Sequence, residues 1–255
     1  MARLDLNTAV GEWVAQHPQT ARVFESFKLD YCCGGNKSLE QACRERHVEP
    51  KSVLAQLEVA VEKDKPLGEN WYDAPLSELC DHIEKTHHMY LRNELPRLTE
   101  LVAKVVAAHA DRYPELNEVE WVLTQLRQEL EPHMMKEERV LFPAIRQMER
   151  SSTVRDYPFG SFANPVACME HEHNSAGEAL ARLRELTDDY EPPSDACQTY
   201  RVMLSALAQL ESDMHQHVHK ENNILFPRAV RMEADRKGAK SGFGMQASCG
   251  GRTEG

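Results

Sequence analysis

The chain has 255 residues, of which 41% are hydrophobic and 28% charged, a composition typical of a globular protein and not of a disordered one. Its 41 acidic residues outnumber its 30 Lys and Arg residues, and the formal charge of −11 argues against nucleic acid or an anionic membrane as a partner. Only 7% of the residues are aromatic, while Leu, Ala, Glu and Arg are abundant, which predicts an all-α fold.

The beginning of the chain and its cysteines indicate where the protein acts. Asp5 and Asn7 stand where a secretory signal would need a continuous apolar stretch, and no run of about 18 apolar residues predicts a membrane span. The seven cysteines are an odd number and form no CxxC pair. Reduced thiols and a cytoplasmic location are therefore expected.

Residues 1–62 predict a small domain of short helices. Val10, Trp13 and Val14 share one face of a first helix. Ser38 with Gln41 three residues later has the pattern of a capping box and predicts a helix start.

Two adjacent cysteines, Cys32 and Cys33, stand in the turn sequence DYCCGG of this domain. We expect both to be exposed near the start of the helix at Ser38, where the reactive thiolate is favoured. Adjacent cysteines rarely bridge each other without strain, so reactive thiols are expected and not a disulfide. Four further cysteines in helical patterns are expected to be small buried hydrophobes: Cys43, Cys80, Cys168 and Cys197.

Composition sets the remaining domain boundaries. Residues 63–74 are charged and interrupted by Pro66 and Gly68, which predicts a linker. Residues 75–235 contain four long helical patterns with short connections, which predict an antiparallel four-helix bundle. The expected helices cover roughly residues 75–110, 115–148, 164–189 and 194–235. Residues 236–255 are rich in Gly and Ser and are expected to be a disordered tail.

The second and fourth of these helices carry one repeated motif. The pattern HxxKExx(V/I)LFP begins at His133 and again at His217, 84 residues later. A repeat of this length inside two helices indicates that both are copies of one structural unit.

The repeated His and Glu are expected to face the core. At a spacing of four residues they lie on one side of a helix. Around the first copy, His133 and Glu137 continue the apolar stripe of Leu130 and lead to Val140, and the second copy has the same phase. Two buried carboxylates need a counter-charge, since each costs several kcal/mol without one. A pair of metal ions would supply it.

The same test of phase sorts the neighbouring histidines. His173 on the third helix lies in the apolar stripe, whereas His171 shares a polar face. His215 and His219 are also four residues apart, but their face is polar, so we expect them at the surface.

On the first helix, His87 and His88 both lead into the same apolar stripe, so periodicity leaves both as candidates, and spacing favours His88 slightly. Four histidines and two glutamates in a bundle core are the ligand mix of a non-haem di-iron site, with di-manganese or zinc as alternatives. Two glutamates do not neutralise two divalent ions, so an oxo or hydroxo bridge is expected. The count also leaves coordination positions open for a small ligand.

These motifs resemble those of a known family. His88, the HxxxE motif at His133, His173 and the HxxxE motif at His217 are similar to the pattern of a hemerythrin-like domain over residues 75–230. The LDYCCGG segment within residues 4–60 resembles the small domain that precedes it in the bacterial repair-of-iron-centres proteins.

The resemblance implies specific residue roles. It implies His88 rather than His87 as the ligand, because the family's ligand lies seven residues before a Leu-Pro pair, here Leu95-Pro96. It also implies Glu137 and Glu221 as carboxylates that bridge two iron ions.

The function implied by the resemblance is repair of iron–sulfur clusters damaged by oxidative or nitrosative stress, through iron donation or nitric oxide removal. Its expected partners are damaged iron–sulfur proteins and the small ligands NO and O₂, with Cys32 and Cys33 acting on the damaged partner, and a homodimer is loosely implied. The alternatives are a module that senses or stores O₂, NO or iron, and an enzyme that reduces nitric oxide.

Overall fold

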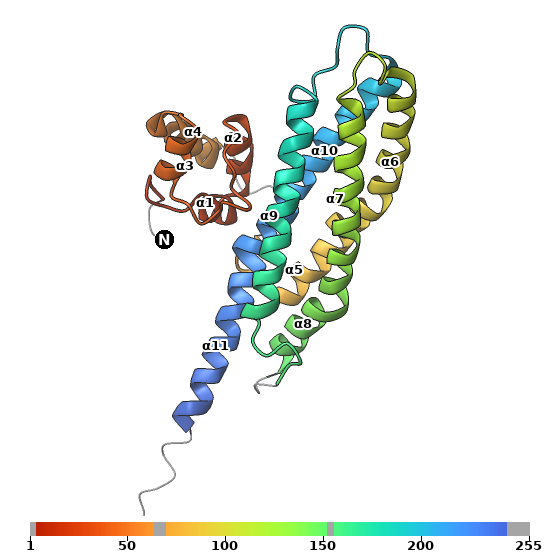
Figure 1. Ribbon diagram of the computed structural model, residues 1–255. Coiled ribbons are helices and arrows are strands. Elements are labelled where there is room, and N and C mark those ends of the chain that lie inside the picture. The colour runs from red at the N-terminus through yellow and green to blue at the C-terminus, as the bar shows by residue number, and fades with distance from the viewer. Residues whose placement is uncertain (1–3, 64–69, 152–155, 244–255) are drawn as a thin grey trace, which may run out of the picture.

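The computed structural model describes residues 4–63, 70–151 and 156–243, and these ranges are helical with short connections. A domain of short helices lies beside a bundle of long ones, as Figure 1 shows. The expected all-α fold is thereby confirmed. Within the described ranges, no helix has both the length and the apolar composition that a membrane span requires.

The N-terminal domain contains the short helices that the sequence predicts. They are α1 (Val10–Gln16), η1 (Pro18–Thr20), α2 (Ala21–Ser26), α3 (Leu39–Glu45) and α4 (Pro50–Lys63). The Ser38 side chain accepts a hydrogen bond from the backbone N–H of Gln41 at 3.2 Å, which confirms the expected cap. Val10, Trp13 and Phe24 are buried and form part of the domain's core.

The bundle consists of four helical rods. They are α5–η2–α6 (Leu76–Ile83, Glu84–His88, Met89–His109), α7–η3–α8 (Leu116–Lys136, Glu137–Leu141, Phe142–Arg150), α9 (Ala163–Leu186) and α10–η4–α11 (Gln198–Lys220, Glu221–Leu225, Phe226–Phe243). The neighbouring pairs α6 with α7, α7 with α9, α9 with α10 and α10 with α6 close the bundle. The first three rods lie close to the ranges predicted for them, and the fourth extends beyond its predicted range.

Three rods are interrupted by π-helical turns, which the sequence patterns did not predict. The segment η2 ends at His88, while η3 begins at Glu137 and η4 at Glu221. A π turn takes up extra backbone and so shifts the phase of the following side chains. In η3, Leu141 is buried and Val140 is 50% exposed, so the expected inward position of Val140 was wrong, whereas its counterpart Ile224 in η4 is buried as expected.

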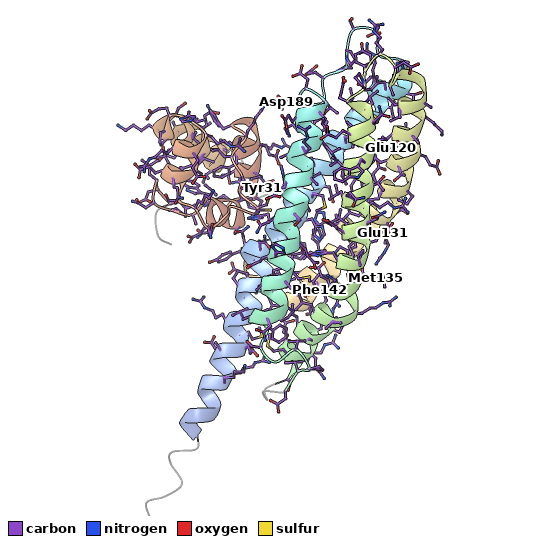
Figure 2. All side chains as sticks on the ribbon, viewed as in Figure 1. Tyr31, Glu120, Glu131, Met135, Phe142 and Asp189 are labelled. Atoms are coloured by element: carbon purple, nitrogen blue, oxygen red, sulfur yellow. The ribbon has the colours of Figure 1, made fainter. Side chains whose placement is uncertain are left out.

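The N-terminal domain is fixed to the bundle through α10 and η4. The side-chain amide of Asn223 donates to the backbone oxygens of Tyr31 and Cys32, at 3.3 and 3.0 Å. Gly11 and Gly35 approach this amide so closely that a Cβ at either position would lie 2.2 Å from Asn223 Oδ1. Figure 2 shows Tyr31 on the side of the domain that faces the bundle. The N-terminal domain thus packs closely around the side-chain amide of Asn223 from the bundle.

The apolar core continues across the boundary between the two parts. Trp13 and Tyr31 of the N-terminal domain belong to the same buried cluster as Met214 and Val218 of α10. The expected linker begins where α4 ends, but its residues 64–69 lie outside the described ranges.

The C-terminal helix is longer than predicted. Helix α11 continues to Phe243, so the expectation that the disordered tail begins at residue 236 was wrong. Arg236 donates to the backbone oxygen of Met148 in α8, which ties this part of α11 to the bundle. Lys237 pairs at 2.8 Å with Glu233, one turn earlier in the same helix. Residues 244–255, the rest of the expected tail, lie outside the described ranges.

Candidate metal centre

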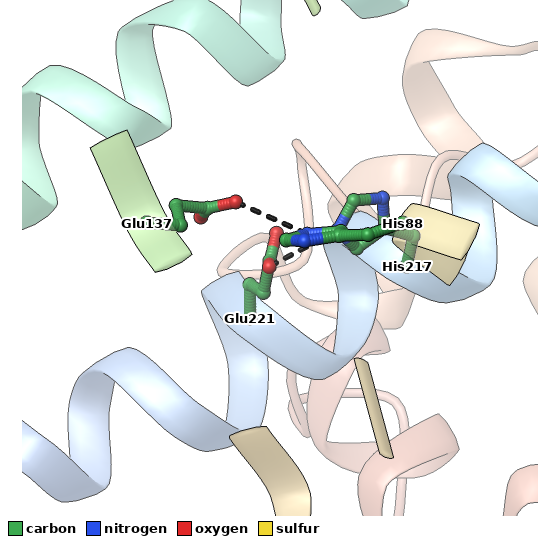
Figure 3. Close-up of side chains that lie close together, drawn as sticks. All are labelled: His88, Glu137, His217 and Glu221. Atoms are coloured by element: carbon green, nitrogen blue, oxygen red, sulfur yellow. Dashed lines mark hydrogen bonds and ion pairs between the residues drawn. The ribbon is translucent and has the colours of Figure 1, made fainter. Parts of the chain in front are cut away.

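The structure brings all six predicted metal-site residues together in the core of the bundle, in two clusters. The first cluster contains His88, Glu137, His217 and Glu221, shown in Figure 3. The Nε2 atoms of His88 and His217 are 3.2 Å apart. Glu137 Oε2 lies 3.3 Å from His88 Nε2, and Glu221 Oε1 lies 3.0 Å from His217 Nε2.

The second cluster uses the same two carboxylates. Its histidines are His133 and His173, whose Nε2 atoms are 3.1 Å apart. Glu137 Oε2 lies 3.3 Å from His133 Nε2, and Glu221 Oε2 lies 3.2 Å from His173 Nε2. Each carboxylate therefore belongs to both clusters, with one pair of imidazoles on either side.

The carboxylates of Glu137 and Glu221 are buried, and hydrogen bonds do not satisfy all of their oxygen atoms. Glu137 and Glu221 are 0% exposed, and both oxygens of Glu137 and Oε2 of Glu221 have no hydrogen-bond partner among the described residues. Burial alone would raise the pKa of Glu221, but His217 and His173 outweigh it and hold that pKa well below its usual range. Two ionised carboxylates in an apolar core need cations beside them.

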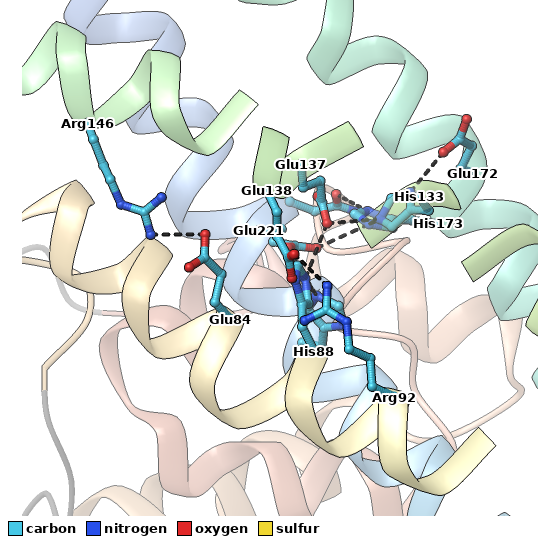
Figure 4. A network of polar contacts seen from close by, with 12 residues as sticks. Glu84, His88, Arg92, His133, Glu137, Glu138, Arg146, Glu172, His173 and Glu221 are labelled. Carbon is cyan, nitrogen blue, oxygen red and sulfur yellow. Dashed lines mark hydrogen bonds and ion pairs between the residues drawn. The ribbon is translucent and has the colours of Figure 1, made fainter. Parts of the chain in front are cut away.

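Three of the four histidines are oriented by hydrogen bonds on their outer nitrogen, as Figure 4 shows in part. The pairs are His88 Nδ1 with Glu138 at 2.7 Å, His133 Nδ1 with Glu172 at 2.8 Å and His173 Nδ1 with Asn222 at 2.7 Å. Each acceptor is an oxygen, so Nδ1 carries the proton and Nε2 is the nitrogen that faces the cluster. This is the arrangement in which a metal-binding imidazole is held.

The sequence patterns missed the two carboxylates that contact these imidazoles, Glu138 and Glu172. Glu138 is paired with Arg92, and Glu172 with Lys136, at the rim of the site. Their position in the sequence could have indicated this role, since each is the direct neighbour of a candidate ligand. Helical periodicity identifies only the residues on the core-facing side of each helix, and these two carboxylates lie beside that side.

The donor set fits a pair of metal ions. Imidazole nitrogen and carboxylate oxygen are ligands that iron, manganese and zinc accept. Two groups of four donors that share both carboxylates suit two ions about 3.5–4 Å apart, as in other dinuclear sites. Cations in the two clusters would give partners to the orphaned oxygens of Glu137 and Glu221.

Comparisons with known proteins agree with this geometry. Residues 79–229 match the model of the hemerythrin HHE cation-binding domain, and residues 6–61 match the ScdA_N domain, which is described as a domain of unknown function. The iron–sulfur cluster repair protein YtfE of Musicola paradisiaca is 36% identical over 227 residues, which are 89% of this chain and 97% of that protein. The chain belongs to this family.

Other members of the family are similar to a comparable degree over nearly the same length. The YtfE protein of Edwardsiella ictaluri is 39% identical over 87% of this chain and 96% of its own length. That of an Escherichia coli strain is 35% identical over 88% of this chain and 97% of its own length. The relatives thus cover both the N-terminal domain and the bundle, as the resemblance of the motifs predicted.

The structure separates the histidines that periodicity left open. His88 lies in the first cluster, whereas His87 Nδ1 contacts Asp213 at 2.9 Å on its outer side. His171 is exposed, as expected. The prediction that His219 lies at the surface was wrong, because the N-terminal domain covers it and its ring lies 5.5 Å from that of Tyr31. His215 is likewise half-buried beside the same domain.

The prediction that both thiols of the DYCCGG turn are exposed was wrong. Cys32 is buried, and Cys33 is half-buried with its Sγ 3.5 Å from the backbone oxygen of His173. The Asp30 carboxylate accepts the N–H groups of Cys32, Cys33 and Gly34, which folds the turn inward. The hydrogen bond with Cys33, burial and Asp30 raise the pKa of the Cys32 thiol well above its usual value. Thiolate at Cys32 is therefore disfavoured.

The other four cysteines in the described ranges divide into two groups. Cys43 and Cys80 are buried as expected, whereas Cys168 and Cys197 are exposed, so for these two the prediction was wrong. Cys197 stands directly before α10, where the N–H of Tyr200 and the imidazole of His109, 3.2 Å away, lower the pKa of its thiol.

We expect Cys197 to react with iodoacetamide at pH 7 faster than Cys32, because the thiolate is the reactive species. The measurement is mass spectrometry of peptides after short exposures of the folded protein. Removing His109 by His109→Phe should slow Cys197 and leave Cys32 unchanged. If Cys32 is labelled first, its burial in the docked turn does not describe the protein in solution.

Proposed function

We propose that this protein repairs damaged iron–sulfur clusters with a di-iron centre whose ligands are the six buried residues. The proposed ligands are His88, His133, Glu137, His173, His217 and Glu221. The observation that carries the proposal is the pair of clusters that share both carboxylates, in a chain whose relatives are named for cluster repair. Iron is favoured over manganese or zinc because a repaired cluster consumes iron.

The side chains account for how such a centre is held. Glu137 and Glu221 would bridge the two ions, since each lies within about 3.3 Å of an imidazole in both clusters. When bound, the iron supplies exchangeable metal and open positions for a small ligand. Glu138 and Glu172 hold imidazoles in position, and the buried carboxylates keep negative charge at a place that water does not reach.

Each ion would have four protein donors, two of them shared with the other ion. Iron in an oxygen and nitrogen environment takes up to six ligands, so we propose an oxo or hydroxo bridge and at least one position open to NO or O₂. Each ion would have only two ligands that it does not share, its pair of histidines, and this small number also favours release of the ion. Iron donation is therefore the repair mode that this geometry supports better than nitric oxide removal.

The cysteine pair is proposed to act on the damaged partner. Cys33 contacts the helix turn that carries His173, and a Cβ at Gly177 would lie 3.4 Å from its sulfur. Cys33 thus lies where the N-terminal domain meets the helix that carries His173. Such a role requires reduced thiols, and we propose that the protein acts in the cytoplasm, where thiols are kept reduced.

Transfer of labelled iron tests the proposal. The protein is loaded with ⁵⁷Fe and mixed with a cluster protein damaged by nitric oxide, and we expect ⁵⁷Fe in the restored cluster. The double variant Cys32→Ser, Cys33→Ser should keep its iron, because neither sulfur belongs to the two His/Glu clusters, and should transfer it poorly. If ⁵⁷Fe stays with the protein while NO or O₂ binds reversibly, the centre is a sensor or store.

A further inference from the structure

The fourth histidine of the centre differs from the other three. Nδ1 of His88, His133 and His173 each has an oxygen acceptor, whereas the buried Nδ1 of His217 has no hydrogen-bond partner among the described residues. Outer hydrogen bonds fix the ring and raise the basicity of the ligating nitrogen, and losing one typically lowers metal affinity about 10- to 100-fold. His217 is thus the least supported of the proposed ligands.

The rings that pack against the histidines differ in the same way. His88 stacks on Phe142 at 5.7 Å, and His173 stacks on Phe226 at 6.1 Å. His217 stacks instead on another imidazole, that of His87, with ring centres 5.2 Å apart and planes 4° from parallel. An apolar ring closes the site behind two ligands, whereas a polar imidazole stands behind His217.

His87 is held by charged neighbours. Lys220 Nζ donates to its Nε2 at 3.1 Å, so the proton of the neutral ring is on Nδ1, which donates to Asp213 at 2.9 Å. The half-buried ammonium of Lys220 lies behind the His217 side of the centre and opposes a divalent ion there. On the His133 side, Lys136 is paired with Glu172 at the rim.

The row of imidazoles continues outward from His87. The ring of His82 lies 5.7 Å from that of His87, and it stacks on Trp71 at 4.2 Å. Exposure increases along this row, since His87 is buried while His82 and Trp71 are half-buried. A cation that leaves His217 would therefore pass polar rings, and not apolar ones, on the way to the surface.

We propose that the two metal positions are inequivalent: the ion between His88 and His217 is the exchangeable one, and the row His217, His87, His82 is its route. This inference rests on the proposed di-iron function and names the ion that is donated. The ion between His133 and His173 remains to hold the bundle together.

Release of ferrous iron to excess ferrozine, followed by absorbance with the full-length protein, tests the inference. We expect two phases of equal amplitude. His87→Phe gives His217 the apolar neighbour that His88 and His173 have, and it should slow the fast phase about tenfold without changing the slow phase or the iron content. His87→Gln, which keeps polar groups at this place, should restore much of the rate.

Variants at three other positions distinguish an effect on the proposed route from a general effect on iron release. His82→Phe changes only the outer part of the row and should also slow the fast phase. Glu172→Gln weakens support of His133 and should speed only the slow phase, while the exposed His171→Phe should change neither. Mössbauer spectra after the first phase should contain one remaining iron environment.

Release of both ions in one phase, or a fast phase that neither His87→Phe nor His82→Phe slows, would overturn the inference while leaving the di-iron function intact. The proposed function fails differently. In that case the isolated protein holds fewer than two iron ions, or transfers none to a damaged cluster.

Discussion

Replacing Glu137 or Glu221 by Gln is expected to remove most of the metal from the protein. Each carboxylate belongs to both clusters, so a single substitution takes a charged ligand from both ions. Gln keeps the size of the side chain but not its charge, and two divalent ions beside one buried carboxylate are poorly compensated. We expect metal content to fall from about two ions per chain to well below one, by elemental analysis of the purified protein.

The thermal midpoint should fall with the metal, since an ion that binds only the folded state stabilises it. Glu170→Gln is the matched control, because Glu170 is exposed on α9 and makes no contact with either cluster. It should keep the metal content and the thermal midpoint of the original chain. A Glu137→Gln protein with two tightly bound ions would show that this carboxylate is not a ligand.

Removing residues 1–69 is expected to abolish most of the repair activity while the bundle still binds metal. All six proposed ligands lie between His88 and Glu221 and come from the bundle. The deletion takes away the cysteine pair, and it uncovers the side of α10 that carries His215 and His219, against which Tyr31 packs. We therefore expect the free energy of unfolding of the bundle to decrease by several kcal/mol.

Elemental analysis measures the metal that the truncated protein retains, chemical denaturation measures its free energy of unfolding, and ⁵⁷Fe transfer measures its repair activity. Gly35→Val offers a full-length comparison, because its side chain would displace the Asn223 amide and loosen the domain without removing the thiols. Lys28→Ala breaks only the exposed ion pair with Asp189 and should have little effect. A truncated protein that repairs at the full rate would make the N-terminal domain dispensable.

Most of the centre can be predicted from the sequence because its residues follow the periodicity of single helices. His133 with Glu137, and His217 with Glu221, lie at a spacing that puts both on one face, and the duplicated motif places that face in the core twice. The four long rods and the cap at Ser38 follow from local patterns in the same way. Such features depend on neighbours a few residues apart.

The remaining features depend on segments far apart in the sequence. His219 has a polar face by the pattern of its own helix, yet Tyr31 of another domain covers it. Cys32 stands in a turn of the kind that is usually exposed, but Asn223 of η4 binds its backbone oxygen and holds it inside. His87 and His88 fit one apolar stripe, and only the approach of α7 and α10 puts His88 beside Glu137 and leaves His87 against Lys220. Periodicity reports which side of a helix is apolar, whereas the tertiary structure decides which partner covers each side.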